Sequence, residues 1–203
     1  MKAGNFIFQT PNHRDKSFDS LFICDTPRIP LHPQYMMVLV YSGELLIAQG
    51  NKDVSTKCGE YVFMKYDNKT VITKNNCGEN KFRGVFMIFR HSFLLKFYSN
   101  LDKRKIPALG ETFDSDIIKL PQTPYIQSLY LSMVPYFNWK TNLSFSLMEL
   151  KLQEGIYNLL LMDDRFYWRL FDFINPDEVN LLYFIKENCI HNLSTNTYIE
   201  KGN

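Results

Sequence analysis

The hydrophobic pattern of this 203-residue chain changes once, near residue 91, and that change limits the folds open to it. Before it, short runs rich in β-branched and aromatic residues alternate with turns that contain glycine or asparagine. After it, glycine becomes scarce and apolar residues recur three and four positions apart, as on a helix. The pattern therefore predicts an antiparallel sandwich or barrel followed by helices, which is an α+β fold.

The runs of the first half predict short strands. They cover residues 6–9, 21–24, 35–41, 44–49, 61–66, 70–73 and 82–89. Side chains alternate along a strand, so Tyr61, Phe63 and Lys65 share one face and the residues between them share the other. This alternation alone does not say which face points inward.

The second half predicts helices at 92–101, 124–137, 143–162 and 163–173, with another that opens at Asn175. The third of these helices carries apolar residues on more than one face. A helix that packs only on its own domain needs a single apolar stripe. The surplus indicates either a second partner, such as another subunit, or a central position within the same domain.

No arrangement of residues typical of a catalytic or metal site occurs in the sequence. The histidines are His13, His32, His91 and His191, and their spacing matches no metal-binding motif. The four cysteines form no CxxC pair, and without an export signal they indicate a cytoplasmic protein with reduced thiols. We therefore expect no metal, no cofactor and no enzymatic activity.

Charge and hydropathy exclude two further classes of partner. Lysine and arginine total 23 against 21 acidic residues, and this net charge of +2 excludes strong nonspecific binding of nucleic acid through bulk charge. The longest apolar run, 35–41, is far too short to cross a bilayer.

Binding of a small molecule is the class of function that remains. A barrel lined by tyrosine, phenylalanine and methionine can hold a small apolar or amphipathic ligand. Lys65 or Arg83 would then pair with a carboxylate of that ligand. The candidate wall residues are Met37, Leu39, Phe63, Phe86 and Ile88. The alternative is that these side chains fill a solid core.

Three segments resemble the cupin-like sensor domain of AraC/XylS-family transcription regulators. Residues 35–46 resemble a strand-turn-strand of the family around Gly-Glu, and 58–64 resemble its Pro-Gly-Glu turn, with Cys58 in place of proline. Residues 150–160 are similar to the Leu-Lys-x-x-Glu-x-x-x-Leu-Leu helix that follows the barrel. Residues 180–194 resemble the start of the DNA-binding half, but the recognition helix expected after them is replaced by 195–203.

The resemblance implies three regions. They are an antiparallel cupin-like β-barrel sensor over 1–91, a helical dimerisation region over 92–174, and a linker with the start of a truncated helix-turn-helix domain over 175–203. The implied function is sensing of a small effector or a regulatory protein by a homodimer, which reaches DNA only through a C-terminal domain missing here. The implied dimer face is Leu143, Leu147, Leu150 and Tyr157.

Two other interpretations remain open at this point. One is a stand-alone cupin enzyme or binding protein. The other is a truncated regulator that does not bind DNA and acts by forming mixed dimers with a full-length relative.

Overall fold

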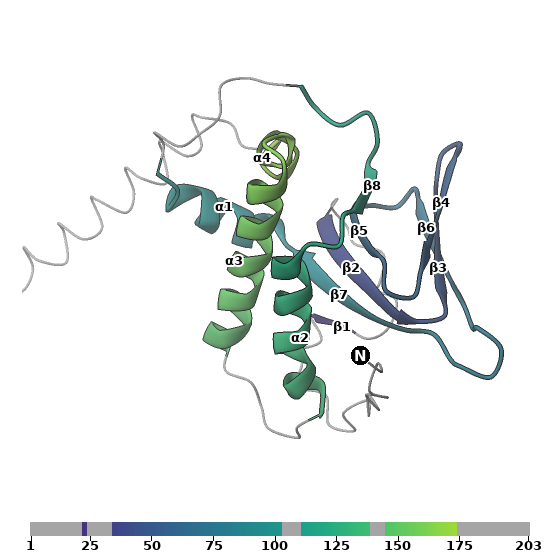
Figure 1. Cartoon of the computed structure of the whole chain (residues 1–203). Helices are drawn as coiled ribbons and strands as arrows, with labels where there is room; N and C mark the ends of the chain where they lie inside the picture. Colours follow the sequence, from purple (N-terminus) through teal and green to yellow (C-terminus); the bar gives the residue numbers. More distant parts are fainter. Residues whose placement is uncertain (1–21, 24–33, 103–110, 139–144, 174–203) are drawn as a thin grey trace, which may run out of the picture.

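A computed structural model describes residues 22–23, 34–102, 111–138 and 145–173 of the chain. Its elements form three layers, with a small sheet on one side, a larger sheet in the middle and helices on the other side (Figure 1). Both sheets are antiparallel throughout. In the described part of the chain, no helix is long and apolar enough to cross a membrane.

The larger sheet has five strands in the order β1-β7-β2-β5-β8. They are β1 (Phe22–Ile23), β2 (Gln34–Ser42), β5 (Tyr61–Tyr66), β7 (Arg83–Phe89) and β8 (Ile117–Leu120). The central strand β2 buries six successive residues, Tyr35 to Val40, so both faces of the sheet are covered. Its register places Met37 opposite both Phe63 of β5 and Met87 of β7.

The small sheet has three strands in the order β4-β3-β6. They are β3 (Glu44–Gln49), β4 (Lys52–Lys57) and β6 (Thr70–Asn75). The chain passes from β2 into β3 through Gly43, whose φ is +79°. A Cβ at this position would collide with the carbonyl oxygen of Asn75, so the turn between the two sheets requires glycine.

The core between the two sheets is largely aliphatic, aromatic and thioether in character, although the small sheet also buries Thr56. Its fully buried members include Met36 and Val38 of β2, Leu45 and Ile47 of β3, and Phe86 of β7. Because side chains alternate along a strand, these residues of β2 and β7 all project from the same face of the larger sheet.

In the described part of the chain, four helices cover the opposite face of the larger sheet (Figure 1). They are α1 (His91–Ser99), α2 (Pro124–Asn138), α3 (Phe145–Met162) and α4 (Arg165–Leu170). Gly155 of α3 lies so close to the sheet that a Cβ there would meet Met87 Cε at 3.0 Å and Phe89 Cζ at 3.4 Å. This absence of a side chain lets α3 pack directly on β2 and β7.

The predicted α+β class is confirmed, and so is the sandwich form of the first half. The predicted closed barrel is not formed by the described strands, which make two separate hydrogen-bonded sheets. The physical reason is that β2 is apolar on both faces, so one face needs a second sheet and the other needs the helices.

Two strands were not predicted. β4 contains one aliphatic residue, Val54, among polar ones, and β8 lies inside the half with helical periodicity. The strand predicted at 6–9, the helix that opens at Asn175 and the region 175–203 lie outside the described residues.

Candidate functional site

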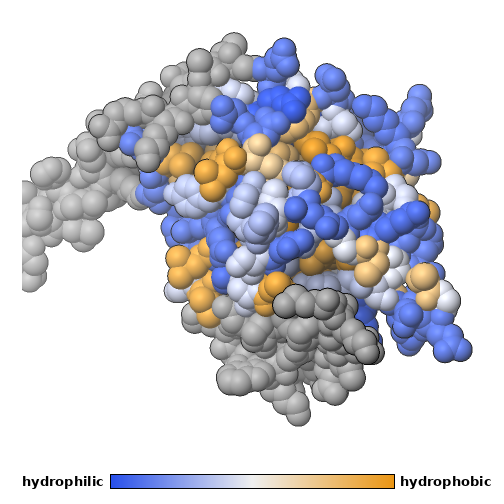
Figure 2. Space-filling model, viewed as in Figure 1, coloured by the Kyte–Doolittle hydropathy of each residue, from blue (hydrophilic) through white to orange (hydrophobic). Residues whose placement is uncertain are grey.

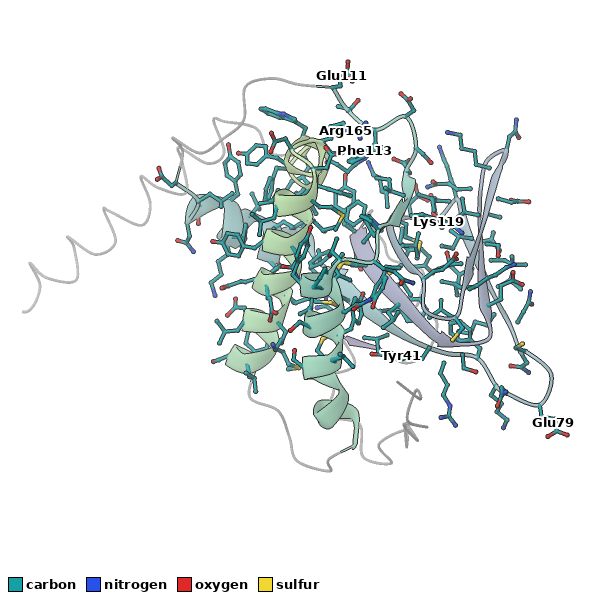
Figure 3. The ribbon with its side chains drawn as sticks, in the orientation of Figure 1. Tyr41, Glu79, Glu111, Phe113, Lys119 and Arg165 are labelled. Carbon is teal, nitrogen blue, oxygen red and sulfur yellow. The ribbon has the colours of Figure 1, made fainter. Side chains whose placement is uncertain are left out.

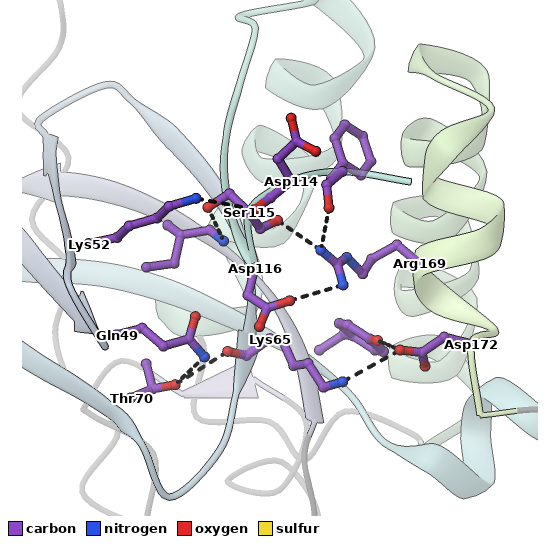
Figure 4. A network of polar contacts seen from close by, with 12 residues as sticks. Gln49, Lys52, Lys65, Thr70, Asp114, Ser115, Asp116, Arg169 and Asp172 are labelled. Carbon is purple, nitrogen blue, oxygen red and sulfur yellow. Dashed lines mark hydrogen bonds and ion pairs between the residues drawn. The ribbon is translucent and has the colours of Figure 1, made fainter. Parts of the chain in front are cut away.

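An open groove of about 750 Å³ lies where one end of the small sheet approaches α4, and we call it the α4 groove. Its walls come from the β3–β4 turn, the β5–β6 turn, the segment 113–117 and one residue of α4. Its charged lining residues are Lys52, Asp67, Lys69, Asp114, Asp116 and Arg169. Figure 4 shows most of these side chains converging from separate segments.

Arg169 of α4 holds the wall of the α4 groove that precedes β8. Its Nη2 donates hydrogen bonds to the carbonyl oxygens of Phe113 at 3.1 Å and Ser115 at 2.9 Å. Its Nη1 lies 2.9 Å from Oδ1 of Asp116 (Figure 4). Hydrogen bonds of a charged donor are roughly twice as strong as neutral ones, so α4 and the segment 113–116 are held together as one unit.

A second polar contact attaches the segment just after α4 to the larger sheet. The Tyr35 hydroxyl donates to Oδ2 of Asp172 at 2.8 Å, and Lys65 Nζ lies 3.5 Å from the same oxygen. Burial raises the pKa of Tyr35 well above its usual value, and the negative charge of Asp172 and the hydrogen bond to it raise the pKa further. The neutral phenol is therefore the form that this contact stabilises.

The segment 113–116 is also braced by aromatic contacts. The Phe113 ring lies 4.7 Å from that of Phe166, and the Arg165 guanidinium stacks over Phe113 at 4.4 Å. Figure 3 shows Phe113 and Arg165 side by side at the end of the helical layer. Arg165 is itself paired with Asp163, Nη2 to Oδ2, at 2.7 Å.

The outer face of α3 carries exposed apolar residues, and Figure 2 shows apolar surface exposed on the helical side. Leu150, Tyr157 and Leu161 are 58%, 50% and 76% exposed, and we call them the α3 stripe. Their spacing of seven and four residues places them within about 40° of one another around the helix axis. The opposite face is buried on the sheet, so most of the surface of the stripe is left uncovered by the described residues, although the Tyr157 ring contacts that of Phe97.

A small cavity of about 110 Å³ lies between α1 and α3, next to the α3 stripe. Phe93, Phe97 and Tyr157 form its apolar lining. An ion pair between Lys96 Nζ and Glu149 Oε1, at 2.6 Å, lies at this cavity. The apolar surface of α3 therefore continues toward α1.

The structure divides the predicted ligand-binding residues between two cores and the surface. Met37, Leu39 and Phe63 face the helices, whereas Phe86 and Ile88 face the small sheet, so they do not line one cavity. Lys65 lies on the helix side beside Asp172, and Arg83 is exposed at the start of β7. The predicted grouping of Tyr61, Phe63 and Lys65 on one face of β5 agrees with the register.

The predicted dimer residues lie on one helix where the structure describes them. Leu150 and Tyr157 belong to the α3 stripe, Leu147 is partly buried, and Leu143 lies outside the described residues. The helix itself, predicted at 143–162, runs from Phe145 to Met162.

The histidines and other metal-ligating side chains give no metal site in the described ranges. No three of His, Cys, Asp and Glu there lie close enough to hold an ion. His91, the first residue of α1, has its ring 3.8 Å from the Phe173 ring. His13, His32 and His191 lie outside the described residues.

The sequence interpretation missed the α4 groove, because its residues are far apart in the chain. Lys52 belongs to a strand that was not predicted, and 113–117 lies between predicted helices. One signal was present: Arg169 stands between Trp168 and Leu170 on a short helix rich in aromatic residues. A charged residue in such surroundings usually has fixed partners.

Comparison with protein families places most of the chain in one of them. The model of the ExsA N-terminal regulatory domain matches residues 35–167. No curated protein sequence matches the chain.

Solved structures of ToxT from Vibrio cholerae are similar to this chain at low sequence identity. A ligand-free variant aligns with a TM-score of 0.45 and 8% identity, covering 72% of this chain and 60% of ToxT. Wild-type ToxT bound to an unsaturated fatty acid aligns with a TM-score of 0.44 and 9% identity, covering 70% of this chain and 51% of that one. The chain thus spans about half to three fifths of the length of these proteins.

Proposed function

Because the chain belongs to the ExsA N-terminal regulatory domain family of AraC-type regulators, we propose that it is a sensing unit that forms a homodimer through α3. In this proposal, a small effector or a protein partner binds to it in the cytoplasm and alters DNA binding by a C-terminal domain. The mechanism is a population shift, in which the bound form favours one arrangement of the helical layer.

The α3 stripe is the observation that carries the dimer. Leu150, Tyr157 and Leu161 expose large apolar side chains on one line of a helix whose other face is fully used. Burial of apolar surface contributes roughly 25 cal/mol per Å², so covering three such side chains on each of two copies favours association. A second copy of α3 is apolar along the same line, which makes it a matching partner in a symmetric interface.

The family resemblance and the α3 stripe share two residues, Leu150 and Tyr157. Leu147, Leu150 and Tyr157 all lie on α3, and Leu143 precedes it in the sequence. Tyr157 also lines the cavity between α1 and α3, which gives a partner side chain a place to enter. Aromatic residues beside such cavities often contribute most of the binding energy at protein interfaces.

The test compares sedimentation velocity of the wild type and two variants, Leu150→Asp and Tyr157→Asp. We expect the wild type to sediment as a dimer at tens of micromolar, the range of weak complexes. Each variant should raise the dissociation constant at least about tenfold, because a buried, unpaired charge at an interface costs more than 1.4 kcal/mol.

The matched control is Val71→Asp on the small sheet. Val71 is 60% exposed, close to the 58% of Leu150, but lies in a different layer. This variant should dimerise like the wild type. A wild type that is monomeric at these concentrations, or equal weakening by all three variants, would refute the proposed dimer face.

A further inference from the structure

The α4 groove has the charge pattern of a site for a small zwitterion. We propose that it binds an amino acid or a short peptide with free amino and carboxyl ends, and that this ligand class is the effector of the regulator. The inference rests on the proposed sensing function, which it deepens by naming the ligand and its site.

The net charge of the lining argues for a zwitterion over a simple anion. Three positive and three negative side chains line the groove, so a ligand with a net charge of zero is matched. A phosphate or another polyanion would meet the carboxylates of Asp114 and Asp116, and like charges in contact repel. A ligand with its two charges at separate ends avoids that repulsion.

The positive side of the groove has ammonium groups available for a carboxylate. Lys52 Nζ donates to the carbonyl oxygen of Asp114 at 3.1 Å and thus contacts a neutral acceptor (Figure 4). Lys69 Nζ has no hydrogen-bond or ion-pair partner among the residues that the structure describes. Its backbone N–H donates to Asp67 Oδ1 at 2.9 Å, which fixes the turn that carries this lysine.

The negative side offers a carboxylate for an ammonium group. Asp116 is paired with Arg169, and Asp67 accepts hydrogen bonds within its own turn. The Asp114 carboxylate has no hydrogen-bond or ion-pair partner within the described ranges, although its backbone is held by Lys52. Among the described residues, Lys52, Lys69, Asp67 and Asp114 therefore have no ion-pair partner, and these two charges of each sign complement the two ends of an amino acid.

The volume and the apolar lining of the α4 groove fit a short peptide. The volume of about 750 Å³ lies within the usual range of small-molecule sites, roughly 300 to 1,000 Å³. Phe113 and Ile117 also line the groove and supply apolar surface for a side chain. The Phe113 ring is fixed by Phe166 and Arg165, so this wall is largely preformed.

The groove is connected directly to α4. Arg169 binds the carbonyl groups on both sides of Asp114. A ligand whose ammonium group binds the Asp114 carboxylate therefore contacts a segment that is hydrogen-bonded to α4. A ligand that favours one position of this segment also favours one position of α4.

The test uses NMR titration of the 203-residue chain with alanyl-alanine and two capped forms. We expect saturable shifts of the amide signals of Lys52, Lys69 and Ser115 with alanyl-alanine. Acetylation of its amino end or amidation of its carboxyl end should weaken binding at least about tenfold, since each removes one charged pair. No saturable shift at millimolar alanyl-alanine, or equal affinity for the capped forms, would overturn the proposal.

Variants locate the two ends of the ligand. Lys69→Met should weaken alanyl-alanine and leave the amidated form unaffected, whereas Asp114→Asn should weaken alanyl-alanine and leave the acetylated form unaffected. The matched controls are Lys81→Met and Asp53→Asn, exposed residues that do not line the groove, and they should bind like the wild type. Circular dichroism confirms that each variant is folded. Sedimentation of the same samples tests dimerisation separately, so a groove without ligand and a failed dimer are distinguishable.

Discussion

The two faces of the five-stranded sheet are both buried, but they pack against different layers and use different side chains. The face toward the small sheet packs methionine, valine and isoleucine against a second sheet in a core without a buried ion pair. The face toward the helices packs aromatic rings against α3 and α4, and polar contacts of Asp172 and Arg169 lie at its margin.

We propose that this difference separates the supporting core from the regions that take part in regulation. Packing in a largely apolar core is non-directional and supports the sheet without responding to a ligand. The hydrogen bonds at α4 are directional, and the α3 stripe is exposed among the described residues, so small shifts of the helices alter both. We therefore assign scaffolding to the core between the two sheets, association to α3, and sensing to the α4 groove, where turns of the small sheet meet α4.

The largest expected effect comes from truncating one buried phenylalanine on each face of the sheet, and it distinguishes the two faces. Phe63→Ala and Phe86→Ala should both lower the unfolding free energy by about 3 to 5 kcal/mol, because both rings are fully buried. Phe63 contacts Phe166 of α4 at a ring distance of 5.2 Å, whereas Phe86 belongs to the core between the sheets. Only Phe63→Ala should therefore change the fluorescence of Trp168 on α4. Equal changes in both variants would contradict the division of roles.

A smaller effect tests how tightly α3 packs on the sheet. Gly155→Ala gains helix propensity of about 1 kcal/mol but places a Cβ 3.0 Å from Met87 Cε. Overpacking usually costs about 1 to 3 kcal/mol, so we expect a net loss of about 1 kcal/mol in urea unfolding. Ser146→Ala, at an exposed position of the same helix, should change stability by less than about 0.5 kcal/mol. A stabilised Gly155→Ala would mean that the helical layer is loosely packed.

The smallest effect depends on pH and concerns the contact of α4 with the sheet. Tyr35→Phe removes the hydrogen bond to Asp172 and should cost about 1 kcal/mol near pH 7. The pKa of Tyr35 is raised in the folded protein, so its contribution is complete below about pH 10 and is lost as the pH rises further. Urea unfolding between pH 8 and pH 11 should therefore show the difference between wild type and variant shrinking above about pH 10. A difference that stays constant to pH 11 would contradict this assignment.

The sequence predicted the elements whose periodicity is local. The strands 44–49 and 61–66 match β3 and β5, and Thr123 with Pro124 marks the start of α2. On α2, Ile126, Leu129, Tyr130 and Met133 are buried at helical spacing. Each of these features depends on neighbours within one or two turns or on simple alternation.

The relations between elements could not be predicted in the same way. The predicted ligand wall combined Met37 with Phe86, but the register places Phe86 opposite Val38 and thus on the other face of the sheet. Barrel closure depends on which strand edges meet, and the α4 groove depends on four distant segments. No local pattern encodes these long-range pairings.

Hydrogen–deuterium exchange at two protein concentrations tests the central assignment most directly. Samples on the order of 1 µM and 100 µM bracket a weak dissociation constant for the dimer. The account predicts that the higher concentration slows exchange in α3, residues 145–162, and leaves β3, β4 and β6 unchanged. Slower exchange confined to the small sheet, or no change in α3, would contradict the assignment of association to the helical side.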